Sequence, residues 1–181
     1  MKKKISRNKN GFTLVEVMIA MAVMTFGILS LVTVFTQGLV ASNQTQVQYI
    51  AQQKAQEAME TIFTSRDTRL ITWSQLGNIS AGGIFKDGAQ PLCAPGPDGL
   101  FGTSDDDLTT PDVVITGPGP DNIFGTSDDV GTNLNPWMTR TITFIPVANT
   151  PNLQSITVTV NWTSEGRAFQ YSISSFISNF Q

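Results

Sequence analysis

Histidine is absent from this chain of 181 residues, and cysteine occurs once, at Cys93. Without histidine the chain lacks the commonest general base and the commonest metal ligand, so a His-activated nucleophile and a zinc or copper centre are not expected. A single cysteine forms no internal disulfide. These absences argue against the commonest catalytic centres, and we expect no enzymatic activity.

Basic side chains are missing from residues 12–53, although the leader of residues 1–10 carries five of them. From Phe12 to Phe35 the only charged side chain is Glu16, and the first half of the chain has no proline. A helix over these 24 residues is about 36 Å long, enough to cross the hydrocarbon core of a bilayer. A carboxylate inside that core costs about 2.5–3.5 kcal/mol on insertion scales, so Glu16 requires a partner, and we expect an amine of another chain.

Acidic side chains outnumber basic ones once the leader is set aside. Removing residues 1–11 takes away five of the 11 Lys and Arg residues and leaves six against 14 Asp and Glu, a side-chain balance of −8. Nucleic-acid phosphate attracts proteins with a basic footprint. Nucleic acid is therefore not an expected partner.

The segment Gly11-Phe12-Thr13-Leu14-Val15-Glu16 follows the basic leader and opens the apolar run. This segment resembles the class III signal shared by type IV pilins and type II secretion pseudopilins. The resemblance implies that a prepilin peptidase cuts after Gly11 on the cytoplasmic side and methylates the new amine of Phe12. It also implies that the carboxylate of Glu16, the fifth mature residue, pairs with the N-terminal amine of a neighbouring subunit.

Two other interpretations of the N-terminal segment compete with processing after Gly11. A secretory signal has an apolar core of about 7–15 residues and a small-x-small cleavage site, which Ala20-Met21-Ala22 supplies. The Glu16 carboxylate and the apolar residues that continue past Ala22 argue against that interpretation. An uncleaved anchor accounts for the basic leader and the length of the apolar run, but not for Glu16.

Beyond Phe35 the apolar residues thin into a stripe with spacings of three and four residues, which is typical of one face of a helix. The stripe comprises Val47, Ala51, Ala55, Ala58 and Ile62. We predict one continuous helix over residues 12–64. Its first part, residues 12–35, spans the membrane, and its second part is amphipathic.

The C-terminal part alternates apolar and polar residues in three segments, 138–144, 155–162 and 169–173, which predicts an antiparallel β-meander. The alternation changes phase near Ser174 and Ser175, where we expect a bulge or the end of a strand. One apolar face of this sheet would cover the stripe of the long helix. The predicted fold class is therefore α+β.

The strand Val158–Trp162, the turn at Gly166-Arg167 and the closing strand with Tyr171 resemble the C-terminal hairpin of V-type minor pilins and I-type minor pseudopilins. This second resemblance implies a type IV pilin-like fold. It also favours a minor subunit over the bulk pilin of a filament.

A repeat of eleven residues lies between the helix and the strands. Copy 1 (residues 96–106) and copy 2 (residues 119–129) are identical at nine of these positions. At another position Gly99 is replaced by Asn122, and these are the residue types that best tolerate a positive φ. The repeat therefore predicts a turn of fixed shape, and it looks like an insertion in a pilin head.

Seven carboxylates lie in or beside the repeat, and we predict that they bind Ca²⁺. They are Asp98, Asp105, Asp106, Asp107, Asp121, Asp128 and Asp129. Calcium takes six to eight oxygen ligands and mixes carboxylates with carbonyls and hydroxyls. Without a cation we expect the like charges to repel one another and the loops to stay mobile, because the only apolar side chains that can hold them are Leu100-Phe101 and Ile123-Phe124. A solvated acidic loop and, less favoured, an acid–base pair of aspartates in an anchored enzyme remain as alternatives.

These patterns divide the chain into regions with different roles. The regions are a prepilin leader (1–11), the long helix (12–64) and a globular head (65–181) with acidic loops (96–129) and a sheet (138–180). We expect a single-pass protein of the bacterial inner membrane, with a cytoplasmic leader and a periplasmic head, that later joins a filament in the periplasm or at the cell surface. Its expected partners are prepilin peptidase and methyltransferase, membrane lipid, and other pilin or pseudopilin subunits.

The predicted function is that of a non-enzymatic, minor subunit of a type IV pilus or related filament. A minor pseudopilin of type II secretion fits the same patterns. A calcium-ordered adhesin at a pilus tip is the alternative from another class.

Overall fold

The computed structural model describes three stretches of the chain, residues 11–134, 137–164 and 166–179. The chain divides into two compact units, one up to Thr45 and one from Gln46 onwards. The leader residues 1–10, together with Glu165 of the predicted turn and Phe180 of the predicted sheet, lie outside the described residues.

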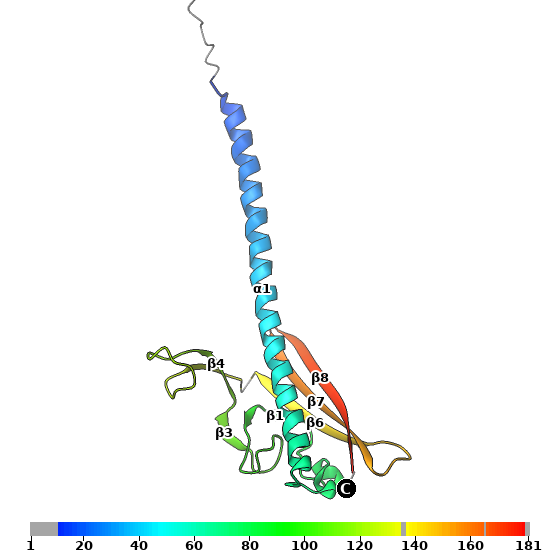
Figure 1. Ribbon diagram of the computed structural model, residues 1–181. Helices are drawn as coiled ribbons and strands as arrows, with labels where there is room; N and C mark the ends of the chain where they lie inside the picture. The colour runs from blue at the N-terminus through cyan, green and yellow to red at the C-terminus, as the bar shows by residue number, and fades with distance from the viewer. Residues whose placement is uncertain (1–10, 135–136, 165, 180–181) are drawn as a thin grey trace, which may run out of the picture. The chain divides into compact units, whose positions relative to one another are not determined.

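Helix α1 runs from Leu14 to Asp67 (Figure 1). Its interior contains no proline, so every backbone N–H can take part in the helical ladder. After the last turn, Arg69 has a left-handed φ of 59°, and the Leu70 N–H returns to the Ser65 carbonyl at 2.9 Å. This backbone reversal ends the helix. The predicted long helix is thereby confirmed, with the bounds Leu14–Asp67 in place of 12–64.

The two parts of α1 differ in the burial of their side chains. In the first unit, the apolar side chains from Phe12 to Leu39 are exposed. In the second unit, one side of the helix is buried in the core of the head. The buried residues are Ala51, Ala55, Ala58, Met59 and Ile62. Because alanine is small, this stripe lets the helix approach the neighbouring strands closely.

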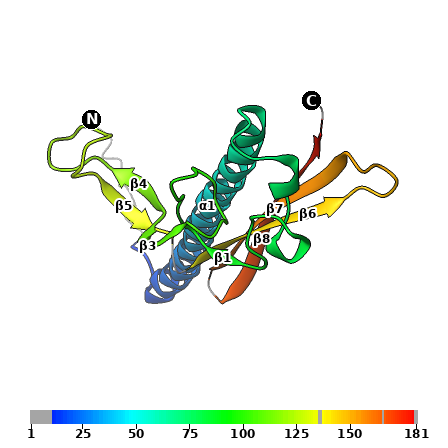
Figure 2. The ribbon, with the colours of Figure 1, turned by 90° about the horizontal axis from the view of Figure 1, so that it is seen from below.

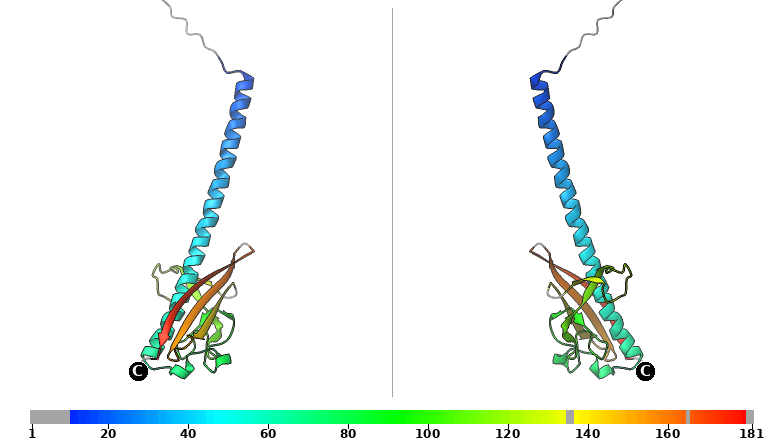
Figure 3. Two further views of the ribbon diagram at one scale, coloured as in Figure 1. Left: turned by 90° about the vertical axis from the view of Figure 1, so that its right-hand side faces the viewer. Right: turned by 90° about the vertical axis from the view of Figure 1, so that its left-hand side faces the viewer.

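Four antiparallel strands form the main sheet in the order β1-β6-β7-β8. Their bounds are Gln90–Pro91, Met138–Pro146, Leu153–Ser164 and Arg167–Ser178. The three long strands follow one another in the chain and pair with their neighbours, so the predicted β-meander is confirmed. Figures 2 and 3 show this sheet alongside the part of α1 that belongs to the second unit.

The core of the head lies between α1 and the inner face of the sheet. Alternate residues of each long strand face inward, as the period of two requires. The buried strand residues include Ile142, Phe144, Ile156, Val158, Val160, Trp162 and Ile177. Removing this apolar surface from water, at about 25 cal/mol per Å², is the main stabilising contribution to the head.

Strand β8 does not bulge or end near Ser174 and Ser175, so that prediction was wrong. Its pairing with β7 continues to Ser178 without a register shift. Ser175 takes an inward position opposite the buried Ile156, and Phe176 points outward with 64% of its surface exposed. The continuous ladder of backbone hydrogen bonds therefore outweighs the side-chain pattern at one small residue.

Two small antiparallel ribbons carry the two copies of the repeat. The first pairs β2 (Cys93–Ala94) with β3 (Asp107–Pro111), and the second pairs β4 (Val113–Gly117) with β5 (Val130–Asn133). Copy 1 joins the strands of the first ribbon, and copy 2 joins those of the second. The sequence repeat is therefore a structural repeat, in which one hairpin follows another.

In the segment between α1 and β1, the side chain of Asn78 is hydrogen-bonded to β6. This segment contains two short 3-10 turns, Trp73–Gln75 and Ile79–Ala81. The Asn78 amide donates to the Ile142 carbonyl at 2.8 Å, and its oxygen accepts the Phe144 N–H at 3.0 Å. Because both the nitrogen and the oxygen of this buried amide are hydrogen-bonded to β6, the side chain holds the segment against that strand.

Candidate functional site

The predicted processing residues lie in a short segment ahead of α1. Gly11, Phe12 and Thr13 are exposed and have no helical conformation. Proteolysis concentrates where backbone is accessible and not held in regular structure. The Gly11–Phe12 bond is therefore accessible, and cleavage at this bond stays a prediction.

Glu16 lies in the first turn of α1, where its backbone N–H donates to the Thr13 hydroxyl at 3.2 Å. Thr13 and Glu16 have the spacing of a capping box, in which the first residue caps the helix. The positive end of the helix dipole also stabilises a carboxylate at this place. Helix capping is therefore a local role of this pair that the sequence analysis missed.

The first part of α1 is long and apolar enough to cross a membrane, with a mean hydropathy of 2.4 over its most apolar window. Its hydroxyl groups donate to carbonyls four residues earlier, at 2.8–2.9 Å. The donors are Thr25, Ser30, Thr33 and Thr36. Because these hydroxyls are satisfied within the helix, lipid can surround them at little cost. The Glu16 carboxylate is the remaining group of the apolar run that requires a partner.

Each copy of the repeat has three equivalent aspartates, named here the first, second and third. They are Asp98, Asp105 and Asp106 in copy 1, and Asp121, Asp128 and Asp129 in copy 2. The first accepts the N–H two residues onward at 2.8 Å in both copies. The second accepts the N–H of the first at 3.3 Å and a threonine hydroxyl at 2.6 Å. The third accepts a glycine N–H at 2.8 Å in copy 1 and 2.7 Å in copy 2.

These hydrogen bonds correct the expectation that little besides the two apolar pairs would hold the loops. Each carboxylate accepts a backbone N–H of its own loop, and hydrogen bonds to a charged acceptor contribute more than neutral ones. The charges therefore stabilise the turn as well as repelling one another. The motif itself, Gly-Pro-Asp with Asp-Asp seven residues later, was the sequence signal for this closure.

The backbone of the two copies also agrees. The predicted exchange of positive-φ residues is confirmed, with φ of 70° at Gly99 and 58° at Asn122. A second positive φ occurs at Gly102 and at Gly125, 83° and 89° respectively. Two copies that share these positive-φ positions and the hydrogen bonds of their aspartates to the backbone are one loop structure used twice.

The surroundings of the copies differ. In copy 1, Leu100 and Phe101 are buried in the core. The Arg140 guanidinium lies 4.1 Å from the centroid of the Phe101 ring, within the range of a cation–π contact. The Lys86 N–H donates to the carbonyl of Gly102 at 2.6 Å. Copy 1 is therefore docked on the head by apolar, cationic and backbone contacts.

In copy 2 the corresponding apolar pair is exposed, with 60% of the surface of Ile123 and 64% of that of Phe124 open to solvent. Within the described residues, the guanidinium and backbone contacts of copy 1 have no counterpart here. Adjacent large exposed apolar side chains are a feature of interaction surfaces.

The seventh carboxylate, Asp107, belongs to neither loop. It opens β3, and its Oδ1 accepts both the N–H of Thr109 at 2.9 Å and its hydroxyl. The hydrogen bond from the Thr109 hydroxyl lowers the pKa of Asp107 to about 2. The predicted set of seven therefore divides into two equivalent groups of three and a separate residue.

Hydrogen bonding and burial shift the pKa values of the repeat carboxylates in opposite directions. The Thr103 hydroxyl holds the pKa of Asp105 below its ordinary value, and the Thr126 hydroxyl does the same for Asp128. Burial raises the pKa of Asp106, although a backbone N–H opposes the shift. Docking of copy 1 on the head therefore disfavours the charged form of Asp106, the third aspartate of that copy.

The donor chemistry of the loops suits calcium, because it consists of carboxylate, hydroxyl and carbonyl oxygens. In the part of the chain that the structure describes, however, no three Asp, Glu or Cys side chains converge as metal ligands. The carboxylates instead accept hydrogen bonds from their own loop. A bound cation would therefore replace some of these hydrogen bonds, and calcium binding stays a prediction.

A cluster of partly buried charges around the buried Arg140, which the sequence analysis missed, lies beside copy 1. Lys54 of α1 forms ion pairs with Asp112 at 2.8 Å and with Glu57 at 2.9 Å. Arg140 faces inward from β6 and is 3% exposed. Burial lowers the pKa of Arg140, whereas the nearby Asp112 raises it. Cys93 is also buried, and burial raises the pKa of its thiol, as expected for an unreactive core side chain.

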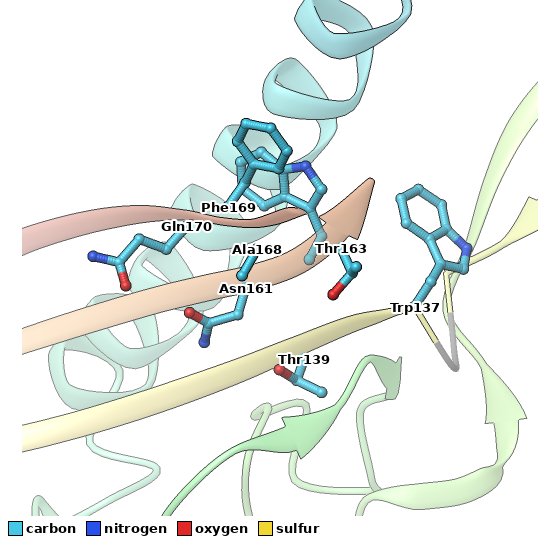
Figure 4. A pocket seen from close by; sticks show the side chains of 8 residues that line it. Trp137, Thr139, Asn161, Thr163, Ala168, Phe169 and Gln170 are labelled. Atoms are coloured by element: carbon cyan, nitrogen blue, oxygen red, sulfur yellow. The ribbon is translucent and has the colours of Figure 1, made fainter. Parts of the chain in front are cut away.

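A pocket of about 350 Å³ lies at one end of the main sheet (Figure 4). Its lining contains no charged side chain and consists of Trp137, Thr139, Asn161, Trp162, Thr163, Ala168, Phe169 and Gln170. Thr139, Asn161 and Gln170 lie directly opposite one another across β6, β7 and β8. The Trp137 indole donates to the Asn133 carbonyl at 2.8 Å, which orients its ring. The arrangement combines a tryptophan with neutral amides and hydroxyls.

Comparison with known proteins identifies the N-terminal segment. Residues 6–32 match the family described as the prokaryotic N-terminal methylation motif. No curated protein and no solved structure matches the chain. The match contains Gly11, Phe12 and Glu16, so the predicted class III signal of type IV pilins is confirmed, and it supports a subunit of the pilin or pseudopilin type.

Proposed function

We propose, from the premise that the chain carries a class III signal, that it is a non-enzymatic, minor structural subunit of a type IV pilus or a related filament. Peptidase cleaves it after Gly11, and Phe12 is methylated. The observation that carries the proposal is the exposed, non-helical Gly11–Phe12 bond directly ahead of an apolar helical stretch, residues 14–35, in which Glu16 is the one charged side chain. A minor pseudopilin of type II secretion has the same requirements.

Cleavage supplies the partner that Glu16 requires. It removes the basic leader and leaves a new amine at Phe12, four residues from Glu16. An unpaired carboxylate among apolar helices is unfavourable, and an opposite charge in contact with it lowers that cost. The amine of a neighbouring subunit satisfies this need when two helices lie side by side, so the pair fixes their relative position along the filament.

The same features determine how the protein crosses the membrane. The basic leader stays in the cytoplasm by the positive-inside preference, and the acidic head is exported. Membrane lipid surrounds the first part of α1 before assembly, and other subunits surround it afterwards. The expected location is the bacterial inner membrane and then the filament.

Substitution of Glu16 tests this function. Glu16→Ala removes the carboxylate but keeps the backbone N–H that contacts Thr13, so helix capping at that atom is preserved. The variant should be cleaved normally and should lose most of its incorporation into filaments. Insertion should not suffer, because the substitution lowers the cost of residence in the membrane. Glu60→Ala, a change at an exposed glutamate of the same helix, is the matched control. Equal incorporation of both variants would contradict the pairing role.

Calcium binding by the head is part of the proposal. This part of the proposal is supported by the chemistry of the loop, which offers oxygen ligands only. The same ligands occur in both copies, on turns with positive φ at equivalent positions. A cation would neutralise charges that otherwise repel one another, and its binding would stabilise the folded head. Asp98, Asp105 and Asp106 would serve the first loop, and Asp121, Asp128 and Asp129 the second, with Asp107 beside the first.

An adhesin at the filament tip is the second candidate, and the pocket of Figure 4 favours it. A tryptophan beside neutral amide and hydroxyl groups suits an uncharged polar ligand such as a sugar unit, which offers an apolar face and several hydroxyls. Location at filament ends, with normal assembly after deletion of the gene, would favour this candidate over the structural subunit.

A further inference from the structure

Copy 2 of the repeat presents an apolar pair that copy 1 buries. Resting on the filament function above, we propose that copy 2 inserts Ile123 and Phe124 into a groove at the C-terminal end of α1 in a second copy of this chain. The residues that line this groove include Arg66, Asp67, Arg69, Ile71, Trp73 and Ser74.

Copy 1 shows which surface suits this loop. Phe101 is buried beneath the Arg140 guanidinium, with the ring centroid 4.1 Å from the guanidinium carbon. Gly102 faces the δ-methyl of Ile142. The surface that receives copy 1 therefore combines an arginine with an aliphatic side chain. Since copy 2 has the same turn and the same phenylalanine, it should prefer a surface of the same chemistry.

The groove has that chemistry. Its volume of about 950 Å³ is ample for an isoleucine and a phenylalanine side chain. Ile71, only 8% exposed, forms an apolar floor, and Trp73 adds an aromatic wall. Arg66 and Arg69 supply two guanidinium groups. Arginine over a phenylalanine ring is the same contact that Arg140 makes in copy 1.

Arg69 is placed unusually for an arginine. Its φ of 59° is in the left-handed region that glycine or asparagine normally occupies after a helix. Within the described residues, Arg69 forms neither an ion pair nor a side-chain hydrogen bond. Arg66, in contrast, is held by Asp67 and by the Ser178 carbonyl. Arg69 therefore remains as the cation that can contact an incoming loop.

The charges of the two surfaces are complementary. Copy 2 carries three carboxylates and no basic residue, a charge of −3. The groove carries two arginines and one aspartate, a charge of +1. Because the loop and the groove share no residue, the contact is heterologous, and a heterologous contact can continue from subunit to subunit in an open series. This is the symmetry that a filament requires.

One loop in one groove buries a small area, so the contact is weak between free molecules. It becomes significant when anchored helices hold the heads close together, because the effective concentration is then high. The test must therefore use the full chain in its membrane or filament.

Cysteine cross-linking of full-length chains in cells tests the contact. One tagged copy carries Ser127→Cys in copy 2, and a differently tagged copy carries Ser74→Cys in the groove; both serines are exposed. A short bis-maleimide should join them, while the buried Cys93 should not react. Ser104→Cys, the matching position in copy 1, should give no product with Ser74→Cys.

Three further substitutions, one of them a control, distinguish docking from chance collision. Phe124→Ala should abolish the Ser127–Ser74 product, whereas Phe176→Ala, at an equally exposed phenylalanine, should leave it unchanged. Arg69→Glu should reduce the yield about fivefold or more, the factor that corresponds to about 1 kcal/mol. Equal yields from Ser104→Cys and Ser127→Cys, or cross-links from Ser127→Cys to other proteins only, would overturn the proposal. The N-terminus of the same samples reports separately on processing, and hence on the filament function.

Discussion

Copy 1 and copy 2 of the repeat have one loop structure and two different surroundings. The carboxylate-to-backbone hydrogen bonds agree within 0.1 Å. Yet Leu100 and Phe101 are buried in the head, whereas Ile123 and Phe124 are exposed. The comparison shows that short-range hydrogen bonds and positive-φ residues set the shape of the turn, and that docking on β6 is a separate event. A duplicated hairpin can therefore keep its fold while its apolar pair serves another partner.

The largest effect should come from removing the phenylalanine of each copy. Phe101→Ala should destabilise the head by about 3–5 kcal/mol, because it leaves a cavity in the core and removes the ring beneath Arg140. Phe124→Ala should change the stability by no more than about 0.5 kcal/mol, as is usual for an exposed side chain. Thermal or urea unfolding of the full-length protein in detergent measures both. Similar losses of stability in the two variants would contradict the proposed difference between copy 1 and copy 2.

Calcium should have the next largest effect. After treatment with a chelator, calcium should raise the Tm, with a stabilisation of about 2.7 kcal/mol when its concentration is one hundred times the Kd. Magnesium should do less, because it demands tighter octahedral geometry and gives up water reluctantly.

Two double substitutions, one in each copy of the repeat, show which copy binds calcium. Asp105→Ala with Asp106→Ala should remove the first site, and Asp128→Ala with Asp129→Ala the second. Calorimetric titration of each variant counts the remaining sites. If millimolar calcium produces neither heat nor a thermal shift in the wild-type chain, the loops are solvated acidic turns only.

A smaller effect concerns the third aspartate. Burial raises the folded-state pKa of Asp106 above its unfolded value, so the folded head gains stability as the pH falls through the folded pKa. Asp106→Asn removes the charge and keeps an oxygen for the Gly102 N–H. Its advantage in Tm over the wild type should be largest at neutral pH and should shrink on acidification. Asp129→Asn, in the exposed copy, is the control and should change the Tm less at neutral pH. An Asp106→Asn advantage that grows toward acid would contradict this account.

Sequence patterns predicted the features that depend on local period or on single residue types. The Ala51–Ala55–Ala58 spacing gave the buried face of α1, alternation gave the meander, and the Gly99–Asn122 exchange gave the positive φ. Each of these signals is repeated along the chain or restricted to few residue types. For that reason it can be recognised without knowledge of distant contacts.

Features that depend on distant contacts could not be predicted in this way. Nothing within the two copies distinguishes the buried Phe101 from the exposed Phe124, because the difference comes from Arg140 and Ile142 on β6. Likewise, the inward position of Ser175 follows from its pairing with β7 and not from its side chain. The burial of Arg140 could have been predicted from the sequence, because alternation places this residue on the inner face of β6 together with Ile142.

The intact mass of the protein extracted from membranes tests the central claim most directly. The account predicts a chain that begins at Phe12 and carries one additional methyl group at its N-terminus. Fragmentation should place that methyl group on the amine of Phe12. A chain that begins at Met1, or one cleaved after Ala22, would contradict processing at Gly11 and with it the assignment as a filament subunit.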